Sequence, residues 1–188
     1  MKSRQTICRL FALTFALLLW LTGCTATQTD DETKKQEAAL NMQVGTVKTD
    51  AFTMDYFRFG EGTKTLVILP GLSVQSVMGS ADAVAEAYRP LTKDFTIYLF
   101  DRRKDLPPVY SVQEMAQDTA AAIDALGLDR VSIFGASQGG MMALHIAIAH
   151  PALVEKLILV STAASVTDTL AQSVEKWVKL AQEGDTAG

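Results

Sequence analysis

Cysteine is scarce in this sequence of 188 residues, which contains only Cys8 and Cys24. Both precede the part of the chain with a globular composition, so a fold held together by disulfides is excluded. Basic charge is also scarce: the formal net charge is −4, and no basic patch of the kind that binds nucleic acid is present. Clusters of His, Cys, Asp and Glu with the spacing of metal ligands are absent, so we expect neither a metal nor a cofactor.

A long hydrophobic run is missing as well. The run at residues 10–21 is shorter than the about 20 residues that a membrane-spanning helix needs. It follows a leader with one lysine and two arginines, as in a secretory signal peptide. Directly after it, Leu21-Thr22-Gly23-Cys24 resembles the lipobox of bacterial lipoproteins, whose cysteine is lipidated after cleavage. The alternative is an ordinary signal peptide with a cysteine there by chance.

The first part of the chain is therefore expected to be a targeting and anchoring segment. Residues 1–23 are predicted to be the signal peptide, and residues 24–41 the lipidated Cys24 with a polar tether. Residues 25–39 contain too few large apolar side chains to fold. Acyl chains on Cys24 would hold the protein on the extracytoplasmic face of a bacterial cell membrane.

Hydrophobic patterning changes from about residue 42 and predicts an α/β core over residues 42–166. Two strands at residues 42–48 and 52–59 form an N-terminal β-hairpin. Buried strands then alternate with helices, which is typical of a mainly parallel sheet with crossover helices. The predicted strands are residues 65–69, 95–100, 131–134 and 157–160, and the helices are residues 81–88, 112–126 and 141–149. In residues 167–188, an amphipathic helix at 168–182 either belongs to this fold or begins a lid.

One motif carries chemistry, Gly135-Ala136-Ser137-Gln138-Gly139, and it lies between a predicted strand and a predicted helix. A Gly-x-Ser-x-Gly pattern at such a turn is typical of a nucleophile elbow, which presents its serine above the sheet. Gly135 and Gly139 fit that turn, because Cβ atoms there would clash with the adjacent strand and helix. The alternative is a glycine-rich turn or a phosphate loop, but the Gly-Lys-Ser/Thr of a Walker loop is missing.

Further segments match a known family together with this elbow. They are Ile68-Leu69-Pro70-Gly71-Leu72-Ser73, Phe100-Asp101-Arg102-Arg103, Ala125-Leu126-Gly127-Leu128 and His150-Pro151. With them, residues 65–162 resemble the N-terminal half of the α/β-hydrolase-1 group of serine hydrolases. The resemblance implies that Ser137 is the catalytic nucleophile. It also implies that the backbone N–H groups of Leu72 and Gln138 form an oxyanion hole.

The rest of a catalytic triad is not evident. The two histidines, His145 and His150, follow Ser137 by eight and thirteen residues on the same predicted helix. They would lie about 12 and 20 Å along its axis, so neither is expected to be the base. In the family the order is serine, acid, histidine, and Asp168 is only a weak candidate for the acid. We therefore expect an incomplete N-terminal part of a hydrolase, whose acid and histidine follow Gly188. The alternative is a shortened protein that has lost catalysis.

Two functions from different classes remain open at this stage. The first is a membrane-tethered serine hydrolase that acts on a small-molecule ester, thioester or amide through an acyl-enzyme on Ser137. The second is a non-catalytic lipoprotein that uses the α/β scaffold to bind a ligand or a partner. Haloperoxidase-like or acyltransferase activity on the same triad is a further possibility within the enzyme class.

Overall fold

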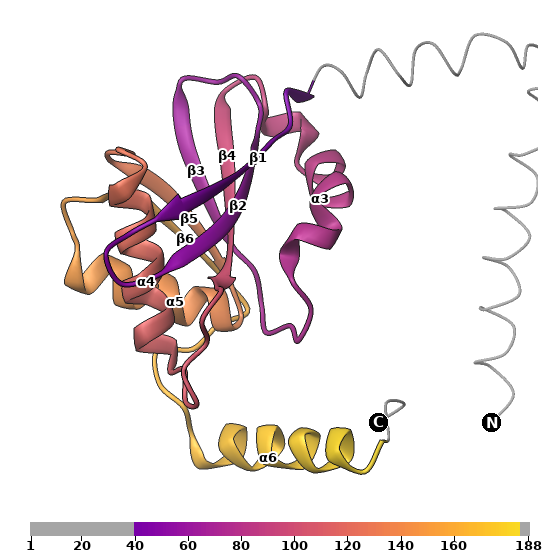
Figure 1. Ribbon diagram of the computed structural model, residues 1–188. Helices are drawn as coiled ribbons and strands as arrows, with labels where there is room; N and C mark the ends of the chain where they lie inside the picture. The colour runs from indigo at the N-terminus through magenta and orange to yellow at the C-terminus, as the bar shows by residue number, and fades with distance from the viewer. Residues whose placement is uncertain (1–39, 185–188) are drawn as a thin grey trace, which may run out of the picture. The chain divides into compact units, whose positions relative to one another are not determined.

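Six strands form one sheet in the computed structural model, which describes residues 40–184 (Figure 1). The order across the sheet is β1-β2-β4-β3-β5-β6. Pairs β1–β2 and β2–β4 are antiparallel, and the other three pairs are parallel. The predicted N-terminal hairpin and mainly parallel α/β sheet are thus confirmed. The strands are β1 (Gln43–Lys48), β2 (Thr53–Phe59), β3 (Lys64–Leu69), β4 (Phe95–Arg103), β5 (Val131–Ala136) and β6 (Val154–Val160).

Helices cover both faces of this sheet. The helices of the described residues are η2 (Val77–Ser80), α3 (Ala81–Ala87), η3 (Arg89–Leu91), α4 (Val112–Ala125), α5 (Gln138–Ala149) and α6 (Asp168–Gln182). Figure 1 shows α4 and α5 on one side of the sheet and α3 on the other. The predicted helix at residues 168–182 is present as α6, where Trp177 is 57% exposed. No helix among residues 40–184 has the length and hydropathy to cross a bilayer.

The side chains of β3 explain why its sequence is a continuous apolar run. Val67 and Leu69 belong to the core beneath α4 and α5. Leu66 and Ile68 point to the opposite face, into the core beneath α3. Successive side chains of a strand alternate between faces, so a strand covered on both sides must be apolar throughout. Burial of the whole run fixes β3 as a central strand.

Several elements extend beyond their predicted bounds, and tertiary contacts explain three of these extensions. Strand β4 continues to Arg103 because β2 pairs with it that far, with Met54 opposite Arg103. Helix α5 begins at Gln138 and so includes two glycines, whose low helix propensity is overridden by close packing. Strand β6 begins at Val154, where the pairing with Val131 starts.

Helix α4 has the end signals that its sequence contains. At its start Ser111 and Glu114 form the predicted capping box, each side chain bonded to the other's backbone N–H. At its end Gly127 has a φ of 65°, and the N–H of Leu128 donates to the carbonyl of Ile123. This is the Schellman arrangement, in which a left-handed residue closes the helix.

The predictions for residues 1–39, which include the signal peptide and Cys24, lie outside the described residues. The predicted tether over residues 24–41 reaches into the described part. There Leu40 is buried at 7% exposure, and its carbonyl accepts a hydrogen bond of 2.8 Å from the N–H of Gly60. Leu40 thus packs in the α3-side core, and the folded part already includes this residue.

Candidate active site

Ser137 occupies the turn between β5 and α5, as the nucleophile elbow requires. Its backbone has φ 50° and ψ −119°, and its side chain is exposed. A positive φ is uncommon and strained for a residue with a Cβ, and such residues concentrate at functional sites. The Ser137 N–H donates to the carbonyl of Val160 at 3.0 Å, which ties the turn to the end of β6.

The two elbow glycines are required by close approach of the backbone. A Cβ on Gly139 would lie 2.0 Å from the carbonyl oxygen of Leu69. A Cβ on Gly135 would lie 2.6 Å from the carbonyl oxygen of Gly139. Both distances are far below a van der Waals contact, so a side chain at either position would displace the backbone of β3 or α5. This is the steric reason that the sequence predicted.

The segment after β3 lies directly beside Ser137. A Cβ on Gly71 would be 3.4 Å from the Cβ of Ser137 and 3.9 Å from its Oγ. Leu72 follows Gly71, and Gln138 is the first residue of α5. Among residues 40–184, neither the Leu72 N–H nor the Gln138 N–H is paired with a protein acceptor. The two backbone donors named from the sequence are thus close to Ser137 in the chain or in space, and both are free to donate.

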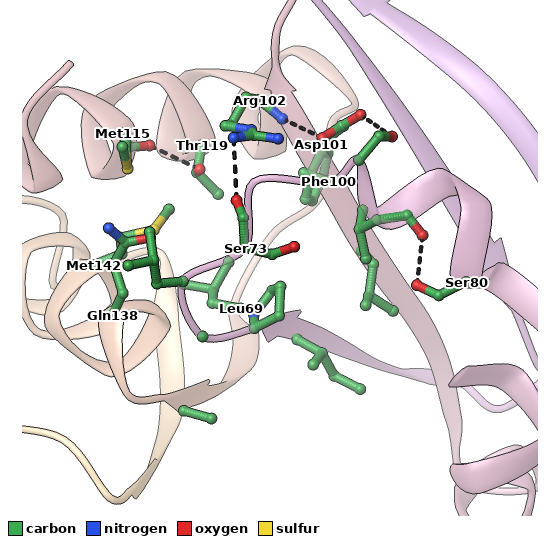
Figure 2. A pocket seen from close by; sticks show the side chains of 18 of the residues that line it. Leu69, Ser73, Ser80, Phe100, Asp101, Arg102, Met115, Thr119, Gln138 and Met142 are labelled. Atoms are coloured by element: carbon green, nitrogen blue, oxygen red, sulfur yellow. Dashed lines mark hydrogen bonds between the residues drawn. The ribbon is translucent and has the colours of Figure 1, made fainter. Parts of the chain in front are cut away.

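A cavity of about 650 Å³ opens beside the elbow. Its lining is mainly apolar and includes Leu72, Ala136 and Gln138 on the elbow side (Figure 2 labels Gln138). Other lining side chains come from both faces of the sheet, among them Met54, Ile68, Val84, Tyr88, Leu99, Phe134 and Met142. An apolar concavity with a few polar groups at its mouth is the usual form of a small-molecule site.

Two charged side chains line this cavity, Asp101 and Arg102 at the end of β4. Figure 2 shows Arg102 bonded to Ser73 and to Asp101. Tyr110 also lines the cavity, and its hydroxyl donates to the Asp118 carboxylate at 2.8 Å. Burial, followed by this carboxylate, raises the pKa of the Tyr110 phenol above its ordinary value of 10.0.

The histidines lie away from this arrangement in the fold. His145 is on the outer face of α5 and His150 is its C-cap, and both are exposed. Asp168 is the first residue of α6 and is also exposed. Within residues 40–184, no group of three or more His, Cys, Asp and Glu side chains could hold a metal ion.

The sheet order, the crossover helices and the strained serine at a strand-to-helix turn define a class of protein. The sequence profile described as "alpha/beta hydrolase fold" matches residues 64–185 of this chain. The chain therefore belongs to the α/β-hydrolase family.

This chain is similar to a named hydrolase and to several solved structures. A protein of Caulobacter segnis named "Putative carbamate hydrolase RutD" is 34% identical over 107 residues, which cover 53% of this chain and 38% of the relative. A hydrolase from Pseudomonas aeruginosa PA01 has the same fold with a TM-score of 0.59 at 24% identity, over 74% of this chain and 53% of that chain. A membrane phospholipase A has a TM-score of 0.59 at 20% identity, over 92% of this chain and 56% of that chain. The chain spans well under half the length of the Caulobacter relative and about half that of each structure.

Sequence reasoning missed two contributions to the site. Thr162 donates a hydrogen bond to the carbonyl of Ser137 from a segment after β6, and no local pattern marks it. Asp101 and Arg102 were noted only as part of the family resemblance, although their place at the carboxyl end of a buried strand was a usable signal. Because carboxyl ends of parallel strands share one edge of a sheet, side chains there converge with those of the elbow.

Proposed function

We propose that this protein is a serine hydrolase that cleaves an ester, thioester or amide through an acyl-enzyme on Ser137. The observation that carries the proposal is the strained, exposed Ser137 beside an apolar cavity, with two free backbone N–H groups nearby. Strain of this kind costs about 1–3 kcal/mol and persists only where the surrounding structure enforces it. Here Gly135 and Gly139 allow the packing that enforces it.

The reaction follows from this geometry. The Oγ of Ser137 forms a bond to the substrate carbonyl carbon while its proton passes to a general base. The carbonyl oxygen becomes an oxyanion and accepts hydrogen bonds from the N–H groups of Leu72 and Gln138. The bond to the leaving group then breaks, and the leaving group takes up the proton. Water next attacks the acyl-enzyme, which releases the acid and restores Ser137.

In this proposal the histidine base and its acid lie in a part of the protein that follows residue 188. His145 and His150 lie on the exposed side and at the far end of α5, about 12 and 20 Å from the elbow along the helix. The Caulobacter relative, of which this chain covers 38%, has room for both groups in its remaining length. The order serine, acid, histidine is the usual one for the fold.

The cavity supports an uncharged, apolar acyl group as the substrate class. Its two charged lining groups, Asp101 and Arg102, are already bonded to protein partners. A charged substrate could pair only with Asp101 or Arg102 in this lining, and it would have to displace the hydrogen bonds that these two side chains already make. The name of the Caulobacter relative adds carbamates to the candidates, because they present a similar electrophilic carbonyl.

A fluorophosphonate probe tests the proposal on the complete gene product. We expect the probe to label the wild-type protein on the peptide that contains Ser137, as read by mass spectrometry. The Ser137→Ala variant should lose the label, and Ser165→Ala, which removes another exposed serine, should keep it. Folded wild-type protein that is not labelled would contradict the proposal and favour a non-catalytic binding protein.

We also propose that Cys24 anchors the protein to the outer face of a bacterial membrane. The support is the sequence alone, a leader and short apolar run that end at Cys24. The test is the intact mass of protein extracted from its native membrane. We expect the mass of a chain that begins at Cys24 plus the mass of its lipid, and Cys24→Ala should remove the lipid. Protein that is processed elsewhere, or carries no lipid, would exclude the anchor.

A further inference from the structure

The segment between β3 and η2, residues 70–76, has no regular structure and little packing of its own. We name it the oxyanion loop because it contains Leu72, the residue proposed to donate to the oxyanion. Its side chains face solvent: Leu72 is 64% exposed and Val74 is 90% exposed. Exposed segments with few buried contacts sample many conformations unless something ties them down. Catalysis by a backbone N–H needs the opposite, a donor already in place before the charge develops.

Arg102 supplies the first tie, from the end of β4. Its Nη1 donates to the carbonyl of Ser73 at 3.2 Å (Figure 2). Its Nη2 donates to the carbonyl of Val74, also at 3.2 Å. A guanidinium is a rigid, planar fork of donors, so two bonds from one group fix two successive carbonyls at once. Because each peptide unit is planar, this also fixes the peptide planes that follow Ser73 and Val74.

Asp101 supplies the second tie. One carboxylate oxygen accepts from the hydroxyl of Ser76 at the far end of the loop. The other accepts from the backbone N–H of Arg102 at 2.9 Å. The Ser76 hydroxyl in turn accepts from the N–H of Met78 at 3.1 Å and caps η2. One carboxylate therefore joins the end of β4, the end of the loop and the start of η2.

These ties leave little freedom around Leu72. On one side Leu69 is held in β3 and Pro70 has a fixed φ. On the other side the peptides after Ser73 are held by Arg102. The N–H of Leu72 lies between these two fixed points, and Gly71 is close enough to Ser137 that a Cβ there would touch the serine side chain.

We propose that Asp101 and Arg102 are positioning residues that hold the oxyanion loop so that the Leu72 N–H is aimed at the oxyanion. The inference rests on the proposed hydrolase function and concerns the same site. Neither side chain is hydrogen-bonded to Ser137: Arg102 acts through the carbonyls of Ser73 and Val74, and Asp101 through the hydroxyl of Ser76. Since the hydrogen bonds are exposed, each contributes little to overall stability, and their loss should affect catalysis far more than folding.

The test compares variants of the complete gene product on a neutral p-nitrophenyl ester. We expect Arg102→Ala to lower kcat about 10- to 100-fold with KM changed less than about threefold, because misplacement by about 1 Å can cost about 100-fold. Arg102→Lys keeps the charge without the fork and should recover only part of the loss. Lys93→Ala removes an exposed positive charge elsewhere and is the matched control.

A second pair tests the Asp101 tie without changing any charge. Ser76→Ala removes the hydroxyl and should lower kcat, whereas Ser76→Thr keeps it and should stay close to wild type. This pair also serves if Arg102→Ala does not fold, as judged by circular dichroism and thermal unfolding.

The outcomes separate the two proposals. If wild-type Ser137 is not labelled by a fluorophosphonate, the hydrolase function fails and this inference fails with it. If Ser137 is labelled and the wild type turns over, but the Arg102 and Ser76 variants keep kcat within twofold, only the positioning role is overturned. A higher KM with unchanged kcat would also overturn it, because Arg102 would then bind substrate directly.

Discussion

The hydroxyl of Thr162 donates a hydrogen bond of 2.7 Å to the carbonyl oxygen of Ser137. The same oxygen accepts from the N–H of Gly140 at 3.0 Å. Gly140 makes room for this contact, because a Cβ there would lie 2.5 Å from the Thr162 side chain. The elbow is therefore held from the segment after β6 as well as from its own helix.

We expect Thr162→Val to weaken the elbow, since valine has the same shape but no hydroxyl. The loss of one hydrogen bond should lower the free energy of unfolding by about 1 kcal/mol and slow fluorophosphonate labelling of Ser137. Thr162→Ser retains the donor and is the control. Urea unfolding and the labelling rate measure both effects. Equal values for the valine and serine variants would show that the bond does not support the elbow.

Gly139→Ala should destabilise the protein strongly, because the new Cβ would lie 2.0 Å from the carbonyl oxygen of Leu69. Overpacking of this kind costs about 1–3 kcal/mol or more. The control is Gly79→Ala, where a Cβ meets nothing within 4 Å. Thermal unfolding should show a lower Tm for the first variant alone. A Gly139→Ala protein as stable as Gly79→Ala would contradict this packing.

Asp55 should contribute stability that is lost in acid. Its carboxylate accepts from the hydroxyl of Thr46, directly opposite on β1, at 2.5 Å, and pairs with Lys104 at 2.9 Å. The Thr46 hydrogen bond, followed by the one from Lys104, holds the pKa of Asp55 below its ordinary 3.8. The stabilisation is therefore complete above about pH 4 and disappears as the pH falls through the lowered pKa.

The measurement for Asp55 is urea unfolding of Asp55→Asn against wild type as a function of pH. We expect the free energy of unfolding of the variant to be lower than that of wild type by up to about 1 kcal/mol at pH 7, as for a partly exposed pair. This difference should narrow below about pH 4. Asp50→Asn removes an exposed carboxylate in the neighbouring turn and is the matched control for the loss of one charge. A difference that does not depend on pH would exclude the charge as its cause.

Tyr110 should contribute stability that is lost in alkali, whereas the contribution of Asp55 is lost in acid. Burial, and then the hydrogen bond to Asp118, raise the pKa of its phenol above 10.0. Because the folded pKa is raised, mainly by burial, neutral Tyr110 contributes its full stabilisation below about pH 10, and this stabilisation is lost as the pH rises through the folded value. In an ultraviolet titration, Tyr110→Phe should remove a tyrosine that ionises above pH 10. Loss of one that ionises at or below pH 10 would contradict the placement of Tyr110.

The candidate site was only partly predictable. The elbow was recognised because Ser137 and its glycines are adjacent in sequence and lie between two segments with clear hydrophobic patterns. The ties from Thr162, Asp101 and Arg102 were not predicted, because each joins residues 25 to 29 positions apart. Ordinary side chains in such contacts carry no local signature.

The sequence by itself determined the α/β class, the order of strands and helices and the position of the turn that contains Ser137. Those features follow from the period of apolar side chains and from glycines at one turn, which are local properties of the chain. Only the tertiary structure decided where β4 ends, that α5 begins at Gln138, and that the oxyanion loop is held by Asp101 and Arg102. The physical reason is that parallel strands bring their carboxyl ends to one edge of the sheet. Side chains that are distant in sequence meet there, and their hydrogen bonds depend on the register of the assembled sheet.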